Sequence, residues 1–139
     1  MEANELMIGD WVGRESHKNT PQQVIGIGDK GVTLKLEGGW CGEAIDLIEP
    51  IPLTPNILEK NGFVREKVTY VPVLYVLYIN HPIYIKASKT VYIMFHDNYI
   101  GITISHIAGK MRQMDGAIEY VHELQHALRL AGIKKEIVL

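Results

Sequence analysis

Apolar and polar side chains alternate in short runs along the N-terminal part of the chain. Val32, Leu34 and Leu36 alternate with Thr33 and Lys35, and a period of two is typical of a strand with one buried face. Similar short apolar runs, separated by glycine-containing turns, cover residues 8–12, 24–27 and 45–48. Four or five short, bent strands in one small module predict an SH3-like β-barrel over residues 1–53.

A short helix is predicted after the barrel, because both of its ends carry characteristic residues. Thr54 suits the N-cap, Pro55 suits the first helical position, and Gly62 suits the left-handed residue that ends a helix. Pro50 and Pro52 form a stiff connector before this helix. We therefore place the boundary between two modules at this connector.

The centre of the chain is rich in strand-forming residues. Apolar runs cover residues 71–79, 83–85, 91–96 and 99–105. Asp97-Asn98 suits a two-residue hairpin turn between the last two runs. We therefore predict an antiparallel sheet of three or four strands.

A second helix is predicted from about Asp115, as N-cap, to Ala131, with Gly132 as its stop. At 100° per residue, its apolar residues fall on one arc that we expect to pack on the sheet; they are Ala117, Tyr120, Val121, Leu124, Ala127, Leu128 and Ala131. The tail is expected to add a short strand at 136–139. The fold class is then α+β, with an SH3-like module at 1–53 and an α+β module at 54–139, both in one compact unit.

Composition and charge narrow the functional classes. The 139 residues carry a formal net charge of −2, and no run of basic residues is longer than Lys134-Lys135. We therefore do not expect nucleic acid as the main partner. The only cysteine is Cys41, the N-terminus is acidic, and no apolar stretch reaches membrane length. We expect a cytoplasmic protein that has no membrane span.

The segment His122-Glu123-Leu124-Gln125-His126 is the strongest candidate for chemistry. Residues four apart on a helix share one face, so His122 and His126 can bind one zinc ion. Glu123 can then act as general base toward a metal-bound water. The pattern favours a small zinc-dependent hydrolase, similar to a peptidase, as one hypothesis.

A catalytic zinc site needs a third protein ligand. The run 122–130 resembles the active-site helix of zinc metalloproteases, but Arg129 and Gly132 occupy the positions of the metzincin glycine and third histidine. Glu136 lies in a tail too short for the downstream helix of thermolysin-like enzymes. The upstream candidates are His96, Asp97 and His106, with Cys41 for an arrangement like that of peptide deformylase. We interpret the resemblance to metalloproteases as coincidental.

Other patterns have structural interpretations. Residues 26–31 match the glycine spacing of a dinucleotide-binding loop, but a strand follows where a helix is required, so we predict a hairpin. Cys41 is interpreted as a partly buried structural thiol. Aromatic residues that can line a peptide- or base-binding surface, although core packing is commoner, are Trp11, Trp40, Tyr70, Tyr75 and Tyr78.

Three segments resemble one family. Residues 49–63 match an "EPIPLT…GF" segment, residues 120–126 are similar to a "YVHxLQN" segment, and residues 4–10 resemble the usual opening. The family consists of small uncharacterised proteins encoded by gut-bacterial phages and mobile elements. It often has Gln and Asn where this chain has Glu123 and His126, which implies that zinc chemistry is incidental to its role.

Two functional hypotheses follow. The first is a non-catalytic binding or interaction protein of phage or mobile-element origin, without a cofactor and with a protein as its partner. The second is the zinc hydrolase, with His122 and His126 as ligands and Glu123 as base. The resemblance names no activity, and it favours the first hypothesis.

Overall fold

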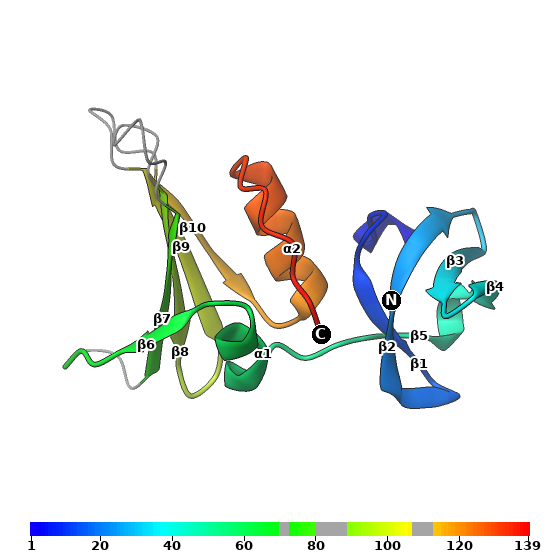
Figure 1. Cartoon of the computed structure of the whole chain (residues 1–139), viewed down its shortest axis with the longest axis horizontal. Coiled ribbons are helices and arrows are strands. Elements are labelled where there is room, and N and C mark those ends of the chain that lie inside the picture. The colour runs from blue at the N-terminus through cyan, green and yellow to red at the C-terminus, as the bar shows by residue number, and fades with distance from the viewer. Residues whose placement is uncertain (70–72, 80–88, 107–112) are drawn as a thin grey trace. The chain divides into compact units, whose positions relative to one another are not determined.

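The computed structural model describes residues 1–69, 73–79, 89–106 and 113–139. It has mixed α+β structure, with two five-stranded antiparallel sheets and a C-terminal helix (Figure 1). Contacts divide the chain into two compact units. The first contains Met1–Pro52, Tyr120–Ile137 and Leu139, and the second contains Leu53–Glu119 and Val138.

The first unit contains a five-stranded sheet with the order β4-β3-β2-β1-β5. Its strands are β1 (Trp11–Arg14), β2 (His17–Ile27), β3 (Gly31–Leu36), β4 (Gly39–Ala44) and β5 (Ile48–Pro50), with 3-10 turns η1 (Ala3–Glu5) and η2 (Ile45–Leu47). Its buried core consists of Leu6, Val12, Val24, Val32, Leu34 and Ile48. Among the described residues no pairing joins β4 to β5, so a closed barrel is not observed.

Two predicted N-terminal strands differ from the structure. Residues 8–12 were expected to be one strand, but Ile8 and Gly9 form a turn and β1 begins at Trp11. Residues 45–48 were also expected to be a strand, but 45–47 form η2. The missing strand is β4, whose glycine-rich sequence has little apolar alternation. Pairing along β3, from Gly31 opposite Ala44 to Leu36 opposite Gly39, stabilises it instead.

The second unit begins with helix α1 (Pro55–Lys60), and both predicted ends are confirmed. The side chain of Thr54 accepts a hydrogen bond from the Ile57 N–H at 3.4 Å. Gly62 has a φ of 87°, in the left-handed region that ends helices. The short strand β6 (Val64–Glu66) follows. The sequence did not indicate β6, because three residues are too few to show a period.

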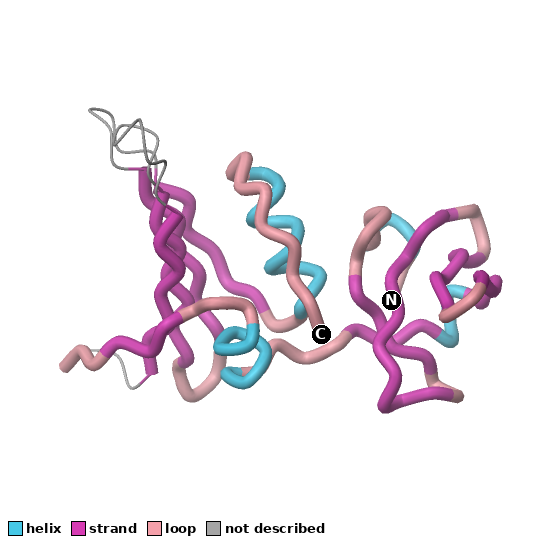
Figure 2. Tube along the Cα trace, in the orientation of Figure 1, coloured by secondary structure: helices cyan, strands magenta, loops and turns pink. Residues whose placement is uncertain are grey.

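The second sheet has the order β10-β9-β8-β7-β6; the strands of both sheets are magenta in Figure 2. Its longer strands are β7 (Val73–Ile79), β8 (Lys89–Phe95), β9 (Ile100–His106) and β10 (Gln113–Ile118). The predicted turn at Asp97-Asn98 is confirmed, since the His96 N–H donates to the Tyr99 carbonyl at 2.9 Å. In the two strands that flank this turn, alternate residues are buried, namely Val91, Ile93, Ile102 and Ile104. The run at 83–85 lies outside the described residues.

The C-terminal helix is shorter than predicted. Helix α2 covers Val121–Leu130, with Tyr120 as N-cap, so the expected start at Asp115 is wrong. Residues 113–118 form β10, which pairs with β9 from Gln113 opposite Ser105 to Ile118 opposite Ile100. Backbone pairing with a neighbouring strand outweighed the helical spacing of Ala117 and Tyr120, because propensity is a weak constraint beside tertiary contacts.

The chain after α2 is an extended tail with no strand, so the strand expected at 136–139 is not present. Gly132 ends the helix as predicted, with a φ of 71°. The Ile133 N–H donates to the Leu128 carbonyl at 2.9 Å. In the first unit, the Trp11 indole N–H donates to the Ile137 carbonyl at 2.6 Å. The tail is therefore held by a side chain of β1. No helix in the described ranges combines the length and the apolar character that crossing a bilayer requires.

Candidate functional site

The three residues of the predicted zinc motif lie on α2. Glu123 and His126 each contact another group of this chain, and His122 is buried. The Glu123 carboxylate accepts a hydrogen bond from the Tyr120 N–H at 3.0 Å. It therefore caps the first turn of the helix, as a carboxylate at the third helical position often does. The His126 imidazole lies 2.6 Å, Nε2 to Oδ2, from the carboxylate of Asp10. Two of the three motif residues thus have partners within the same chain.

His122 is buried, with 5% of its surface exposed, although it lies outside the apolar arc predicted for this helix. Its ring is stacked against Tyr120 at 5.8 Å and meets His126 edge-on at 5.6 Å. Burial lowers the pKa of His122 below its usual value, and this effect exceeds the attraction of the Asp10 charge. The imidazole is therefore neutral at pH 7, and its buried Nδ1 has no hydrogen-bond partner among the described residues.

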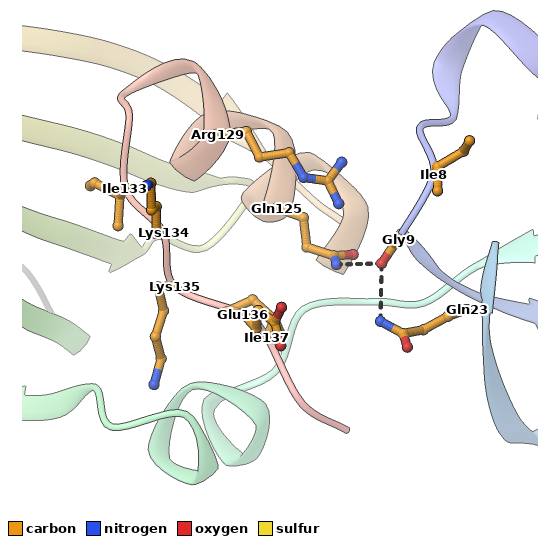
Figure 3. A pocket seen from close by; sticks show the side chains of 10 residues that line it. All are labelled: Ile8, Gly9, Gln23, Gln125, Arg129, Ile133, Lys134, Lys135, Glu136 and Ile137. Atoms are coloured by element: carbon orange, nitrogen blue, oxygen red, sulfur yellow. Dashed lines mark hydrogen bonds between the residues drawn. The ribbon is translucent and has the colours of Figure 1, made fainter. Parts of the chain in front are cut away.

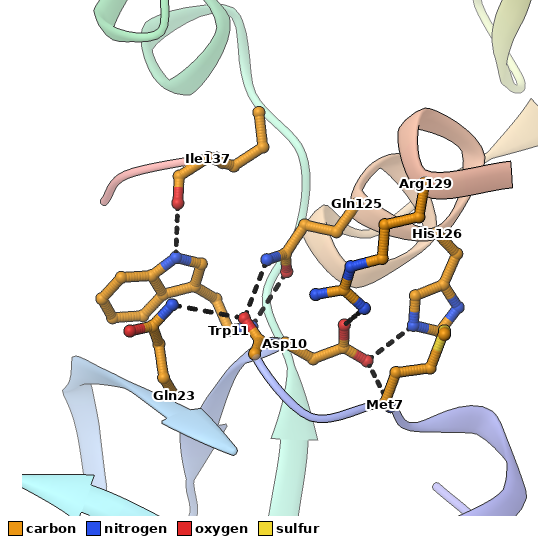
Figure 4. Close-up of polar contacts among 9 residues, drawn as sticks. Met7, Asp10, Trp11, Gln23, Gln125, His126, Arg129 and Ile137 are labelled. Atoms are coloured by element: carbon orange, nitrogen blue, oxygen red, sulfur yellow. Dashed lines mark hydrogen bonds and ion pairs between the residues drawn. The ribbon is translucent and has the colours of Figure 1, made fainter. Parts of the chain in front are cut away.

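Asp10 is the centre of a polar cluster that the sequence did not indicate (Figure 4). Its side chain is fully buried, and Oδ1 lies 3.1 Å from Nη1 of Arg129. Oδ2 accepts a hydrogen bond from the Met7 N–H at 2.8 Å as well as contacting His126. A buried carboxylate is tolerated only when such donors replace water. Asp10 therefore connects the N-terminal segment to α2 across more than a hundred residues of sequence.

A turn at residues 7–10 places Asp10 in this position. The Asp10 N–H donates to the Met7 carbonyl at 3.1 Å, and Gly9 has a φ of 94°. Glycine at the third position with positive φ is typical of a type II turn. The Gly9 N–H donates to the Val24 carbonyl at 2.7 Å, which joins the turn to β2.

Gln125 forms a second connection between α2 and this turn. Its amide oxygen accepts from the Trp11 N–H at 2.9 Å, and its amide nitrogen donates to the Gly9 carbonyl at 3.0 Å. The amide of Gln23 also donates to the Gly9 carbonyl, at 3.3 Å. A single buried glutamine thus satisfies two backbone groups that the sheet leaves unpaired.

The described residues contain no group of three histidine, cysteine, aspartate or glutamate side chains arranged to hold a metal ion. Of the proposed upstream ligands, His96 is stacked on Tyr99 at 4.3 Å beside the β8–β9 turn, and Asp97 is exposed within that turn. The side chain of His106 lies outside the described residues. Cys41 is half-buried, with its Sγ 3.6 Å from Nη1 of Arg14. The structure therefore brings Asp10 to the motif.

An open groove of about 450 Å³ adjoins the polar cluster (Figure 3). The turn contributes Ile8 and Gly9, β2 contributes Gln23, and α2 contributes Gln125 and Arg129. The tail completes the wall with residues 133–137. Ile8 is 64% exposed although it lies on a turn held by hydrogen bonds at both ends. The groove therefore combines an exposed apolar side chain with polar walls.

A second hollow of about 260 Å³ lies along the outer face of the first sheet. Gln23 lines both this hollow and the groove. Trp11 and Lys35 also line it. Trp11 is opposite Gln23 in the β1–β2 pairing, and Lys35 is opposite Trp40 in the β3–β4 pairing. Trp40 is 69% exposed. Two of the predicted aromatic candidates thus lie on one sheet.

The other predicted aromatic residues have different positions. Tyr75 is a core residue of the second unit, where its hydroxyl donates to Glu59 at 2.9 Å. Tyr78 is 56% exposed on β7, and Tyr70 lies outside the described residues. The glycine-rich stretch 26–31 forms the β2–β3 hairpin, as expected, with the Gly28 N–H donating to the Gly31 carbonyl at 2.9 Å. The strand β3 thus follows this stretch, where a dinucleotide-binding loop is followed by a helix.

Sequence reasoning missed Asp10, Gln125 and Arg129, although the structure joins them in one cluster. Gly9-Asp10 could have been interpreted as a turn, but nothing in the sequence indicates that a helix near the other end of the chain meets it. Comparison with protein families, curated proteins and solved structures finds no match. The functional argument therefore depends on the geometry of the site.

Proposed function

We propose that this protein is a non-catalytic interaction module of phage or mobile-element origin whose partner is another protein. One observation carries the proposal: the exposed Ile8 lies on a fixed turn beside the open groove. When a partner covers an exposed apolar side chain on a rigid backbone, little conformational entropy is lost on binding. Such positions are typical of residues that anchor interfaces.

The roles of the motif residues support the absence of catalysis in this proposal. Glu123 caps α2, and His126 contacts the buried carboxylate of Asp10. His126 would have to bind zinc through Nδ1 or give up its contact with Asp10, and Glu123 would have to act while one of its oxygens caps the helix. Their present partners instead stabilise the wall of the groove.

The second hollow supports an extended partner segment. Because Gln23 lines both hollows, a segment in the groove can continue past it toward Trp11 and Lys35. Flat aromatic rings beside a long side chain are typical of surfaces that bind extended peptides. The exposed Trp40 lies opposite Lys35 at the end of this path.

We further propose that the first sheet belongs to an SH3-like barrel and that the protein acts in the cytoplasm. The order β4-β3-β2-β1-β5, with the 3-10 turn η2 before β5, supports the barrel. The single cysteine, Cys41, supports a reducing compartment. The similarity of residues 49–63 and 120–126 to the phage family supports the proposed origin.

Selection from a library of short random peptides tests the function. Immobilised wild-type protein is expected to enrich a common peptide motif. Ile8→Asp is expected to abolish this enrichment, because it places a charge where the apolar contact is needed. Val64→Asp is the matched control, since Val64 is similarly exposed, at 55%, but lies on β6 in the second unit. Failure to enrich any motif, or equal enrichment by Ile8→Asp, would overturn the proposal.

A further inference from the structure

Positive side chains outnumber negative ones in the groove, although the whole chain has a net charge of −2. Arg129, Lys134 and Lys135 line it together with a single carboxylate, that of Glu136. The buried Asp10 offsets much of the charge of Arg129, because the two form an ion pair at 3.1 Å. The remaining charges are the positive charges of Lys134 and Lys135 and the negative charge of Glu136. The groove is thus locally cationic in an acidic chain.

The backbone of the tail holds the lysines in place. Ile133 and Ile137 are buried, at 5% and 3% exposure, while the three residues between them are exposed. The Trp11 indole fixes the Ile137 carbonyl, and the Leu128 carbonyl fixes the Ile133 N–H. A charged segment anchored at both ends loses less entropy on binding than a free tail would.

Arg129 adds a directional donor to the same wall. Nη1 contacts Asp10, and the guanidinium carries further N–H donors. Its Nη2 lies against Gly9, where a Cβ would be 2.9 Å away. The absence of a side chain at Gly9 therefore makes room for the guanidinium at the groove, and the Arg129 side chain remains 35% exposed.

We propose that the groove recognises an acidic segment of the partner protein, in which Asp or Glu residues lie next to an apolar residue. Lys134, Lys135 and the outer N–H groups of Arg129 bind the carboxylates, and the apolar residue covers Ile8. Charge complementarity selects this occupant, because carboxylates are the protein groups that pair with Lys and Arg. The inference rests on the proposed function and adds the chemistry of the partner.

A nucleic acid fits this groove less well than an acidic peptide. Phosphate backbones are bound by extended rows of cations, and here three cations lie with Glu136 and with the Asp10 carboxylate behind Arg129. The neighbouring Ile8 offers an apolar contact that a phosphate cannot use. A peptide can present both a carboxylate and an apolar side chain within a few residues.

Fluorescence anisotropy with defined peptides tests the inference on the full chain. Three labelled peptides share one apolar core and carry Glu, Gln or Lys at the flanking positions. The Glu peptide is expected to bind about tenfold more tightly than the Gln peptide, which corresponds to a modest gain from two or three rim charges. The Lys peptide is expected not to bind. Added salt is expected to weaken the Glu peptide selectively.

Charge reversal of the tail provides the decisive variant. The double variant K134E/K135E is expected to lose about tenfold in affinity for the Glu peptide and to gain affinity for the Lys peptide. Both lysines are exposed, so folding is expected to be unchanged, and circular dichroism checks this. The matched control is K30E/K67E, which changes the net charge equally at exposed lysines outside the groove.

The outcomes separate the inference from the proposed function. Equal binding of the Glu and Gln peptides, or equal losses in the two double variants, would overturn the acidic specificity. Tighter, Lys134-dependent binding of single-stranded DNA would overturn it in favour of nucleic acid. If the peptide selection still yields an Ile8-dependent motif without acidic residues, the interaction module stands and only the proposed chemistry of its partner fails.

Discussion

The imidazole of His126 lies 2.6 Å from the carboxylate of Asp10, although 116 positions of sequence separate the two residues. The same carboxylate contacts Arg129 and accepts the Met7 N–H. One face of the helix that carries the zinc-motif pattern thus binds the N-terminal turn of its own chain. A motif that resembles a catalytic site thus takes part in a structural connection between α2 and the N-terminal turn.

Removal of the Asp10 charge is expected to destabilise the first unit. Asp10→Asn leaves Arg129 and His126 without a buried carboxylate, and the loss of one partner of such a cluster costs about 3 kcal/mol. The free energy of unfolding in urea measures this effect. Asp29→Asn, an exposed carboxylate in the β2–β3 turn, is the control and is expected to change stability very little. Equal effects of the two variants would contradict the assigned role of Asp10.

Stability is expected to fall as the pH drops below about 6.5, because burial lowers the pKa of His122 from that reference value. Just below this pH the unfolded chain binds a proton that the folded chain does not, so acidification favours unfolding. The carboxylates of Asp10, Glu123 and Glu5 raise the pKa of His122 and His126 lowers it, while burial, which also lowers it, is the largest effect. Urea unfolding across a pH series measures the dependence.

A variant without the buried imidazole isolates this effect. His122→Gln is expected to flatten the pH dependence below the reference pKa, because the buried titrating group is gone. His17→Gln removes an exposed histidine of the β1–β2 hairpin and is expected to keep the wild-type slope. An unchanged slope in His122→Gln would show that other groups cause the acid sensitivity.

The turn that presents Ile8 is expected to depend on glycine at position 9. Gly9→Ala is expected to lower the free energy of unfolding by about 1 kcal/mol or more, because φ at this residue is 94° and residues with a side chain rarely adopt this value. The added methyl also displaces the Arg129 guanidinium from its place against the turn. Gly39→Ala is the control, since a Cβ there meets no atom within 4 Å. Thermal and urea unfolding compare the two.

Zinc content tests the alternative hypothesis directly. Protein purified without a chelator or a histidine tag is expected to contain no stoichiometric zinc, because two imidazoles need a third ligand to form a catalytic site. Elemental analysis provides the measurement. One zinc per chain, lost in His126→Ala but retained in His17→Ala, would restore the hydrolase hypothesis.

Several local features could be predicted from the sequence. The limits of α1 follow from Thr54 and Gly62, and the β8–β9 hairpin follows from Asp97-Asn98 and its alternating flanks. These features depend on residues close together in sequence. Strands β4 and β10 could not be predicted in the same way. Their stability comes from pairing with β3 and β9, and in β10 this pairing replaced a helical pattern.

The candidate site also has some features that the sequence determines locally and others that depend on tertiary contacts. The sequence alone determined that His122, Glu123 and His126 lie on one helix, because their spacing is a local property of α-helices. Only the tertiary structure decided what these side chains do, since it brings Asp10 to His126 and buries His122. It also forms the groove, because Ile8, Gln23 and Lys134 come from three distant segments. Local spacing determines which side chains share a face, but only folding brings distant segments within hydrogen-bond distance of that face.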